Sequence, residues 1–156
     1  MKNCIIIPAR LNSKRIPGKP LVKLKGKPLI IKTIERLKKK INLDHIYVCT
    51  DDKIIANVVD KKITNKSIII NKYCLNGTER CSRALNKIKK KYDYATIVSC
   101  DMPFLNADVI KYIEKKFKLI KKNTDGVTVH CKINDKRILN ETDIAKIIFS
   151  KSNKIL

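Results

Sequence analysis

The chain has 156 residues, of which 44% are hydrophobic and 32% charged, which fits one globular domain and excludes a disordered chain. Its formal net charge of +22 comes from 30 Lys and only 6 Arg, and 5% of the residues are aromatic, with no Trp. Because Arg and aromatic rings are the usual readers of nucleic-acid bases, this composition argues against nucleic acid as a partner.

The N-terminal apolar run is too short for a signal peptide, and no segment is long enough to span a membrane. The six Cys residues are widely spaced, with no Cys-x-x-Cys pair, so we expect reduced and mostly buried thiols rather than a metal site. We therefore predict a cytoplasmic protein with no membrane partner.

Short runs rich in Ile and Val alternate with amphipathic stretches, which predicts an α/β domain with a mostly parallel central sheet flanked by helices. The expected strands are residues 4–7, 45–50, 67–71, 95–100 and 126–132. The expected helices are residues 27–40 with Pro28 in the first turn, residues 52–61, a helix after Asn76 and one from about Asn106. We expect the inward faces of the last two to carry Cys81, Ala84, Leu85 and Ile88, and Val109, Ile110, Ile113, Phe117 and Ile120.

The C-terminal segment predicts a β-hairpin that lacks most of its second arm. Residues 144–149 are expected to form a strand and residues 150–154 a turn, after which only Ile155 and Leu156 remain. We therefore expect one domain over residues 1–156 that is cut short at its C-terminus.

A basic loop follows the first strand, with Arg10, Lys14, Arg15 and Lys19 within thirteen residues. Ligands of open α/β sheets bind beyond the carboxyl ends of the strands, and four cations there suit a polyphosphate. Spacing alone does not distinguish this loop from an ordinary basic loop in a basic protein.

Residues 9–21, Ala-Arg-Leu-x-Ser-x-Arg-Ile-Pro-Gly-Lys-Pro-Leu, followed by Gly-Lys-Pro-Leu-Ile at 26–30, resemble the signature of the 3-deoxy-manno-octulosonate (KDO) cytidylyltransferases, also called CMP-KDO synthetases. The resemblance continues at Val-Cys-Thr-Asp-Asp (48–52), Gly-Thr-Glu-Arg (77–80) and Val-Ser-Cys-Asp-Met-Pro-Phe (98–104). It implies a Rossmann-like nucleotidyltransferase domain.

The resemblance also implies an activity and its partners. Family enzymes transfer CMP from CTP to the sugar acid KDO, in lipopolysaccharide precursor synthesis: the anomeric hydroxyl attacks the α-phosphorus and pyrophosphate leaves. Mg²⁺ is the implied cofactor, and a homodimer is implied for a full-length member. An acylneuraminate or other sugar cytidylyltransferase is the alternative enzyme, and an inactive remnant that holds nucleotides or RNA is the alternative outside catalysis.

The site residues follow from the same motifs. By resemblance, Arg10, Lys19 and Asp101 are catalytic, and Asp101 is the Mg²⁺ ligand, since carboxylates suit this hard cation. The implied nucleotide-binding residues are Pro8, Ala9, Arg10, Ser13, Arg15, Lys19, Gly77, Thr78, Arg80 and Ser99. Structural roles are expected instead for Asp51 and Asp52 as helix caps, for the buried Cys100, and for His45 and His130, while Glu79 is either a helix N-terminal charge or a ligand.

Two departures from the family pattern bear on this implied mechanism. Ser99 stands where the family has the Gln that reads the pyrimidine edge, and a hydroxyl has a shorter reach than an amide. Family members also continue past Leu156 into a region that supplies sugar-acid contacts and a second metal-binding Asp.

Overall fold

The computed structural model describes residues 2–12, 16–63, 66–120, 124–142, 144–152 and 155. The chain divides into two compact units, Met1–Lys111 and Tyr112–Leu156, and each is described by itself. Among the described residues, no helix is long and apolar enough to cross a membrane.

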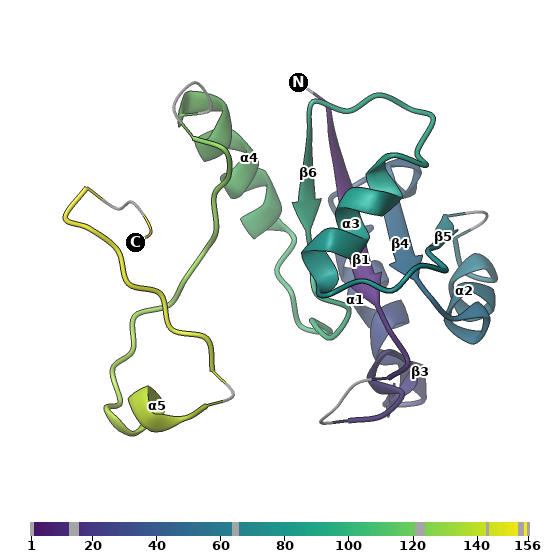
Figure 1. The fold of residues 1–156 in the computed structure, drawn as a ribbon, viewed down its shortest axis with the longest axis horizontal. Coiled ribbons are helices and arrows are strands. Elements are labelled where there is room, and N and C mark those ends of the chain that lie inside the picture. Colours follow the sequence, from purple (N-terminus) through teal and green to yellow (C-terminus); the bar gives the residue numbers. More distant parts are fainter. Residues whose placement is uncertain are drawn as a thin grey trace. The chain divides into compact units, whose positions relative to one another are not determined.

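The first unit is built on a four-stranded parallel sheet in the order β5-β4-β1-β6 (Figure 1). Its strands are β1 (Asn3–Ala9), β4 (Ile46–Thr50), β5 (Ser67–Ile69) and β6 (Tyr94–Ile97), which confirms four of the five expected strands. The last two end earlier than expected, so residues 98–101 belong to a loop. Because all four strands are parallel, their carboxyl ends lie at one edge of the sheet.

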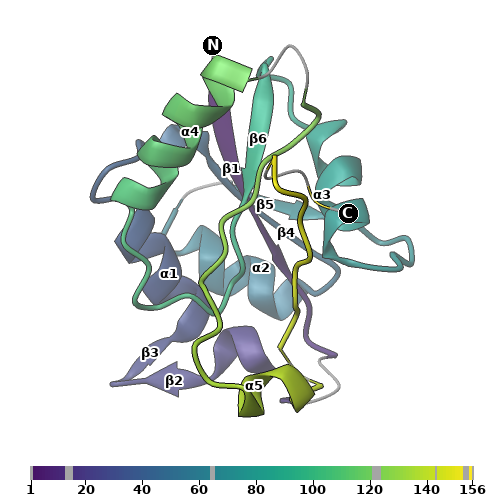
Figure 2. The ribbon, with the colours of Figure 1, turned by 90° about the vertical axis from the view of Figure 1, so that its left-hand side faces the viewer.

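Helices cover both faces of this sheet (Figure 2). On one face, α1 (Leu29–Leu37), α2 (Lys53–Asp60) and the first turn of α4 (Asp108–Ile120) pack on the side chains of Ile5 and Ile7. On the other face, α3 (Gly77–Leu85) packs Cys81 and Ala84 on Cys4 and Ile6. Alternate side chains of β1 therefore pack into the cores on the two faces of the sheet, as expected for a Rossmann-like fold.

A short hairpin precedes α1 and was not expected. After the 3₁₀ turn Lys19–Leu21, strands β2 (Lys23–Leu24) and β3 (Lys27–Pro28) pair across Lys25 and Gly26, which both have positive φ, 50° and 76°. Two-residue β-hairpin turns of type I′ require a positive φ at both central residues. The prediction that Pro28 lies in the first turn of the helix is wrong, because this pairing keeps Pro28 extended as the cap of α1.

Two inward-facing predictions on the helices are also wrong. Leu85 and Ile120 are exposed, and each is the last residue of its helix, where fewer residues of its own helix flank it. Cys81, Ala84 and Ile110 are buried as expected. The remaining short element of the first unit is the 3₁₀ turn Leu43–His45 before β4.

The second unit contains the later turns of α4 and the short helix α5 (Arg137–Asn140). The expected strands at 126–132 and 144–149 are wrong: the described residues of these segments form no ladder, and only an isolated antiparallel bridge joins Phe149 to Ile155. A strand needs a neighbour to accept its backbone hydrogen bonds, and within the described part of these segments only Phe149 has such a neighbour, Ile155.

Candidate functional site

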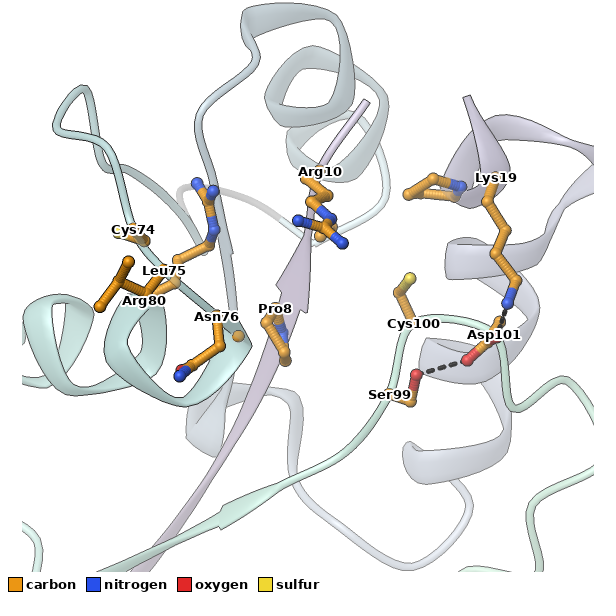
Figure 3. A pocket seen from close by; sticks show the side chains of 13 residues that line it. Pro8, Arg10, Lys19, Cys74, Leu75, Asn76, Arg80, Ser99, Cys100 and Asp101 are labelled. Atoms are coloured by element: carbon orange, nitrogen blue, oxygen red, sulfur yellow. Dashed lines mark hydrogen bonds and ion pairs between the residues drawn. The ribbon is translucent and has the colours of Figure 1, made fainter. Parts of the chain in front are cut away.

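A cavity of about 350 Å³ opens at the carboxyl ends of β1 and β6, beside the first residues of α3 (Figure 3). In Figure 3, Ser99, Asp101 and Lys19 lie on one side, Leu75, Asn76 and Arg80 on the other, and Pro8 and Arg10 between them. The lining residues are Pro8, Ala9, Arg10, Lys19, Pro20, Cys74, Leu75, Asn76, Gly77, Arg80, Ser99, Cys100 and Asp101.

Asp101 is the carboxylate of this cavity, and both of its oxygens have partners. Ser99 Oγ donates to Oδ1, and Lys19 Nζ forms an ion pair with Oδ2. Burial raises the pKa of the Asp101 carboxyl, but the hydrogen bonds from Lys19 and Ser99 outweigh it, so that the pKa lies below its ordinary value. Asp101 is therefore ionised at neutral pH and remains partly open to solvent, with 26% of its side chain exposed.

Arg80 enters the cavity from α3 and is held by one partner. Its Nη2 donates to Asp51 Oδ2 at 2.8 Å, and only 7% of its side chain is exposed. Its Nη1 is buried and has no hydrogen-bond partner among the described residues, which is costly for a guanidinium donor.

The start of α3 is fixed by local hydrogen bonds. Asn76 Oδ1 accepts from the Glu79 backbone N–H at 2.9 Å, and Glu79 Oε2 accepts from the Leu75 N–H at 2.7 Å. This resembles a capping box, except that the glutamate reaches the residue before the cap. Glu79 also pairs with Arg83 at 2.7 Å, and these hydrogen bonds, from Leu75 first and then from Arg83, lower the pKa of Glu79. In this structure Glu79 is thus a helix N-terminal charge.

Asp52 and Asp51 have different roles. Asp52 is the cap of α2, since its Oδ1 accepts from the backbone N–H groups of Ile54 and Ile55 at 2.7 and 3.2 Å, as expected. The prediction that Asp51 is a cap is wrong, because its carboxylate pairs with Arg80 across 29 residues of sequence.

Cys100 lines the cavity without the features of a nucleophile. Burial, and then the charge of Asp101, raise the pKa of its thiol to about 11. His45 contacts Tyr92, with its Nδ1 3.1 Å from the tyrosine hydroxyl, far along the chain from the lining residues. Among the described residues, no three His, Cys, Asp or Glu side chains gather in a way that could hold a metal ion, and Asp101 is the one carboxylate among the residues that line the cavity.

A family model described as cytidylyltransferase matches residues 4–154 of the chain. The chain belongs to the cytidylyltransferase family. It is 43% identical over 114 residues to the mitochondrial 3-deoxy-manno-octulosonate cytidylyltransferase of Arabidopsis thaliana, covering 73% of this chain and 39% of the relative. It is 37% identical over 149 residues to 3-deoxy-manno-octulosonate cytidylyltransferase of Wigglesworthia glossinidia brevipalpis, covering 95% and 60%.

Among solved structures, the chain is similar to CMP:2-keto-3-deoxy-manno-octonic acid synthetase complexed with CTP. The TM-score is 0.68 and the identity 28%, over 76% of this chain and 48% of that one. The expected family and fold are therefore confirmed. The chain spans between 39% and 60% of the length of these three proteins.

The cavity brings together residues from three separate motifs. The predicted residues among its lining are Pro8, Ala9, Arg10, Lys19, Gly77, Arg80, Ser99 and Asp101. Thr78 is exposed and does not line the cavity, and Ser13 and Arg15 lie outside the described residues. The catalytic, metal-binding and nucleotide-binding roles of all the predicted residues stay predictions.

Sequence reasoning missed five lining residues: Pro20, Cys74, Leu75, Asn76 and Cys100. Three of them adjoin a predicted site residue, so proximity to a motif could have found them. Cys74 and Leu75 precede α3 in a segment with no recognisable pattern, and only the fold brings them to the cavity.

Proposed function

We propose that this chain binds CTP in the cavity, and that the protein it represents transfers CMP from CTP to KDO with release of pyrophosphate. The observation that carries the proposal is the charge of the cavity: Arg10, Lys19 and Arg80 lie around one carboxylate, Asp101. Three cations and one anion suit a triphosphate bound with a divalent cation.

Each charged residue has a role in nucleotidyl transfer, where positioning and charge stabilisation lower the barrier. Arg10 and Lys19 hold the phosphates and offset the charge that develops on the leaving pyrophosphate. Arg80 lines the cavity and adds a third positive charge to its wall. Lys19 forms an ion pair with Asp101, so the phosphates of CTP would compete with this carboxylate for the lysine ammonium.

The donors around Asp101 fit Mg²⁺, a hard cation that takes one or two carboxylates together with phosphate oxygens and water. Asp101 and the Ser99 hydroxyl lie together in the cavity wall and would hold it. When bound, the ion neutralises phosphate charge. By the family resemblance, we further propose a cytoplasmic homodimer that serves lipopolysaccharide precursor synthesis.

Titration calorimetry of the chain with CTP and saturating Mg²⁺ tests the first part. We expect one CTP per chain and weaker binding of UTP and GTP. If none of these nucleotides gives a heat of binding, the proposed site is overturned. Equal affinities for CTP and UTP would support the proposed site but contradict its preference for cytosine. This comparison is informative because Ser99 stands where the family has the Gln that reads the pyrimidine edge.

Transfer is measured as pyrophosphate release from CTP by the protein that carries this chain, with KDO or N-acetylneuraminate as the acceptor. Release with KDO alone supports the proposal. Release with neuraminate alone would favour the other sugar-acid enzyme of the family.

A further inference from the structure

Side chains of α1 form hydrogen bonds with the backbone of the loop that carries Asp101. Thr33 is completely buried, and its Oγ1 lies 3.0 Å from the Cys100 carbonyl, to which it donates, and 3.1 Å from the Met102 N–H, from which it accepts. A single hydroxyl therefore binds the peptide groups on both sides of Asp101. The same oxygen lies 3.1 Å from the Leu29 carbonyl of its own helix, so its proton is shared between two acceptors.

A second contact comes from the same face of α1. Arg36, three residues after Thr33, donates from Nε to the Pro103 carbonyl at 3.0 Å. Residues three apart lie on one side of a helix, so Thr33 and Arg36 both contact the backbone of the loop between Cys100 and Pro103. We call these two residues the α1 clamp.

The loop depends on this clamp because the sheet has ended. Strand β6 stops at Ile97, and Val98 makes the last backbone bond to β1, from its N–H to the Ile6 carbonyl at 3.0 Å. Beyond Val98 the buried backbone groups need other partners, and Thr33 supplies them for Cys100 and Met102. Neither clamp residue lines the cavity, so neither is placed to touch a ligand there.

We propose that Thr33 and Arg36 are positioning residues that hold the Asp101 carboxylate where it meets Lys19 and a nucleotide-bound cation. This inference rests on the proposed function of the cavity. Residues that orient a metal ligand commonly change metal affinity when they are replaced, although they do not touch the ion. A purely structural role would instead lower stability and leave the Mg²⁺ dependence of nucleotide binding unchanged.

The test compares CTP affinity with and without Mg²⁺ in Thr33→Val and Arg36→Met. Val keeps the size of Thr without the hydroxyl, and Met keeps the alkyl stem of Arg without the donors. We expect each variant to lose about 10- to 100-fold of the affinity measured with Mg²⁺, with little change in its absence. Arg36 is only partly buried, so Arg36→Met decides the question if Thr33→Val does not fold.

Two matched variants complete the design. Thr33→Ser keeps the hydroxyl and should keep the Mg²⁺ dependence of the wild type. Thr96→Val removes a hydroxyl of β6 that accepts a hydrogen bond from Asn3 Nδ2 at 3.0 Å. This variant should also keep the Mg²⁺ dependence of the wild type.

The outcomes separate the two proposals. Wild-type Mg²⁺ dependence in both Thr33→Val and Arg36→Met would overturn the clamp and leave the nucleotide site standing. If the wild type itself shows no Mg²⁺-dependent CTP binding, both the nucleotide site and the clamp are overturned.

Discussion

Lys19 and Asp101 form an ion pair in the wall of the cavity, and this pair joins the loop after β1 to the loop after β6. Their side chains are 29% and 26% exposed, so each charge is partly removed from water and compensated by the other. Under the proposed function, a triphosphate competes with Asp101 for the ammonium, and a cation competes with Lys19 for the carboxylate. The ion pair holds both groups in the cavity wall, where these ligands would meet them.

Replacing Lys19 with Met should weaken Mg²⁺-dependent CTP binding about 10- to 100-fold. Hydrogen bonds to charged groups contribute about 1.5–3 kcal/mol, and each 1.4 kcal/mol is about tenfold in affinity. The measurement is calorimetry at constant ionic strength.

The control for this variant is Lys27→Met. Lys27 pairs with Glu35 at 2.8 Å on the surface, with 54% of the lysine side chain exposed, and it does not line the cavity. We expect less than about a twofold change, because screened surface charges contribute little. Equal losses in the two variants would mean that CTP senses the overall positive charge rather than this site.

Asp101→Asn should reverse the effect of Mg²⁺ on CTP affinity. Without Mg²⁺, the loss of a negative charge and the release of Lys19 should strengthen CTP binding. With Mg²⁺, binding should weaken, because the carboxylate that suits the cation is gone. Calorimetry at several Mg²⁺ concentrations measures both. A variant whose affinity still rises with Mg²⁺ as in the wild type would show that the cation is held by the phosphates alone.

Asp51→Ala should lower the free energy of unfolding by about 1–3 kcal/mol, because it leaves the buried guanidinium of Arg80 without its acceptor. Asp51 itself is 43% exposed, so water compensates part of the loss and the larger values seen for fully buried pairs do not apply. Urea unfolding measures the change.

Two further variants calibrate that experiment. Asp51→Asn keeps an acceptor oxygen and should lose less than Asp51→Ala. Glu35→Gln breaks the surface pair with Lys27 and should cost less than about 1 kcal/mol. A cost for Asp51→Ala no greater than that of Glu35→Gln would contradict a structural role for the Arg80 pair.

The parts of this fold that could be predicted from sequence are those with local causes. The run at residues 4–7 is apolar because both faces of β1 are covered, and Asp52 caps α2 through hydrogen bonds two and three residues away. The motifs also indicated all four charged residues of the cavity, Arg10, Lys19, Arg80 and Asp101, through resemblance rather than through spacing.

The missed features depend on contacts between distant residues. The Arg80 partner lies 29 residues away, and Thr33 meets Cys100 across 67 residues, so no local pattern reveals either. The expected strand at 126–132 failed for the opposite reason: its alternating apolar residues favour a strand, but pairing requires a neighbour that local sequence does not supply.

The six cysteines should differ sharply in reactivity, and Cys131 should react first. It is exposed, whereas the other five are buried. Burial raises the pKa of both Cys4 and Cys100 to about 11, so at pH 8 only about 0.1% of either thiol is the reactive thiolate. A thiol-reactive disulfide reagent should therefore modify one thiol quickly in the folded chain and six in denaturant. Cys131→Ser should remove the fast phase, and a fast phase that survives in this variant would mean that one of the buried thiols is accessible.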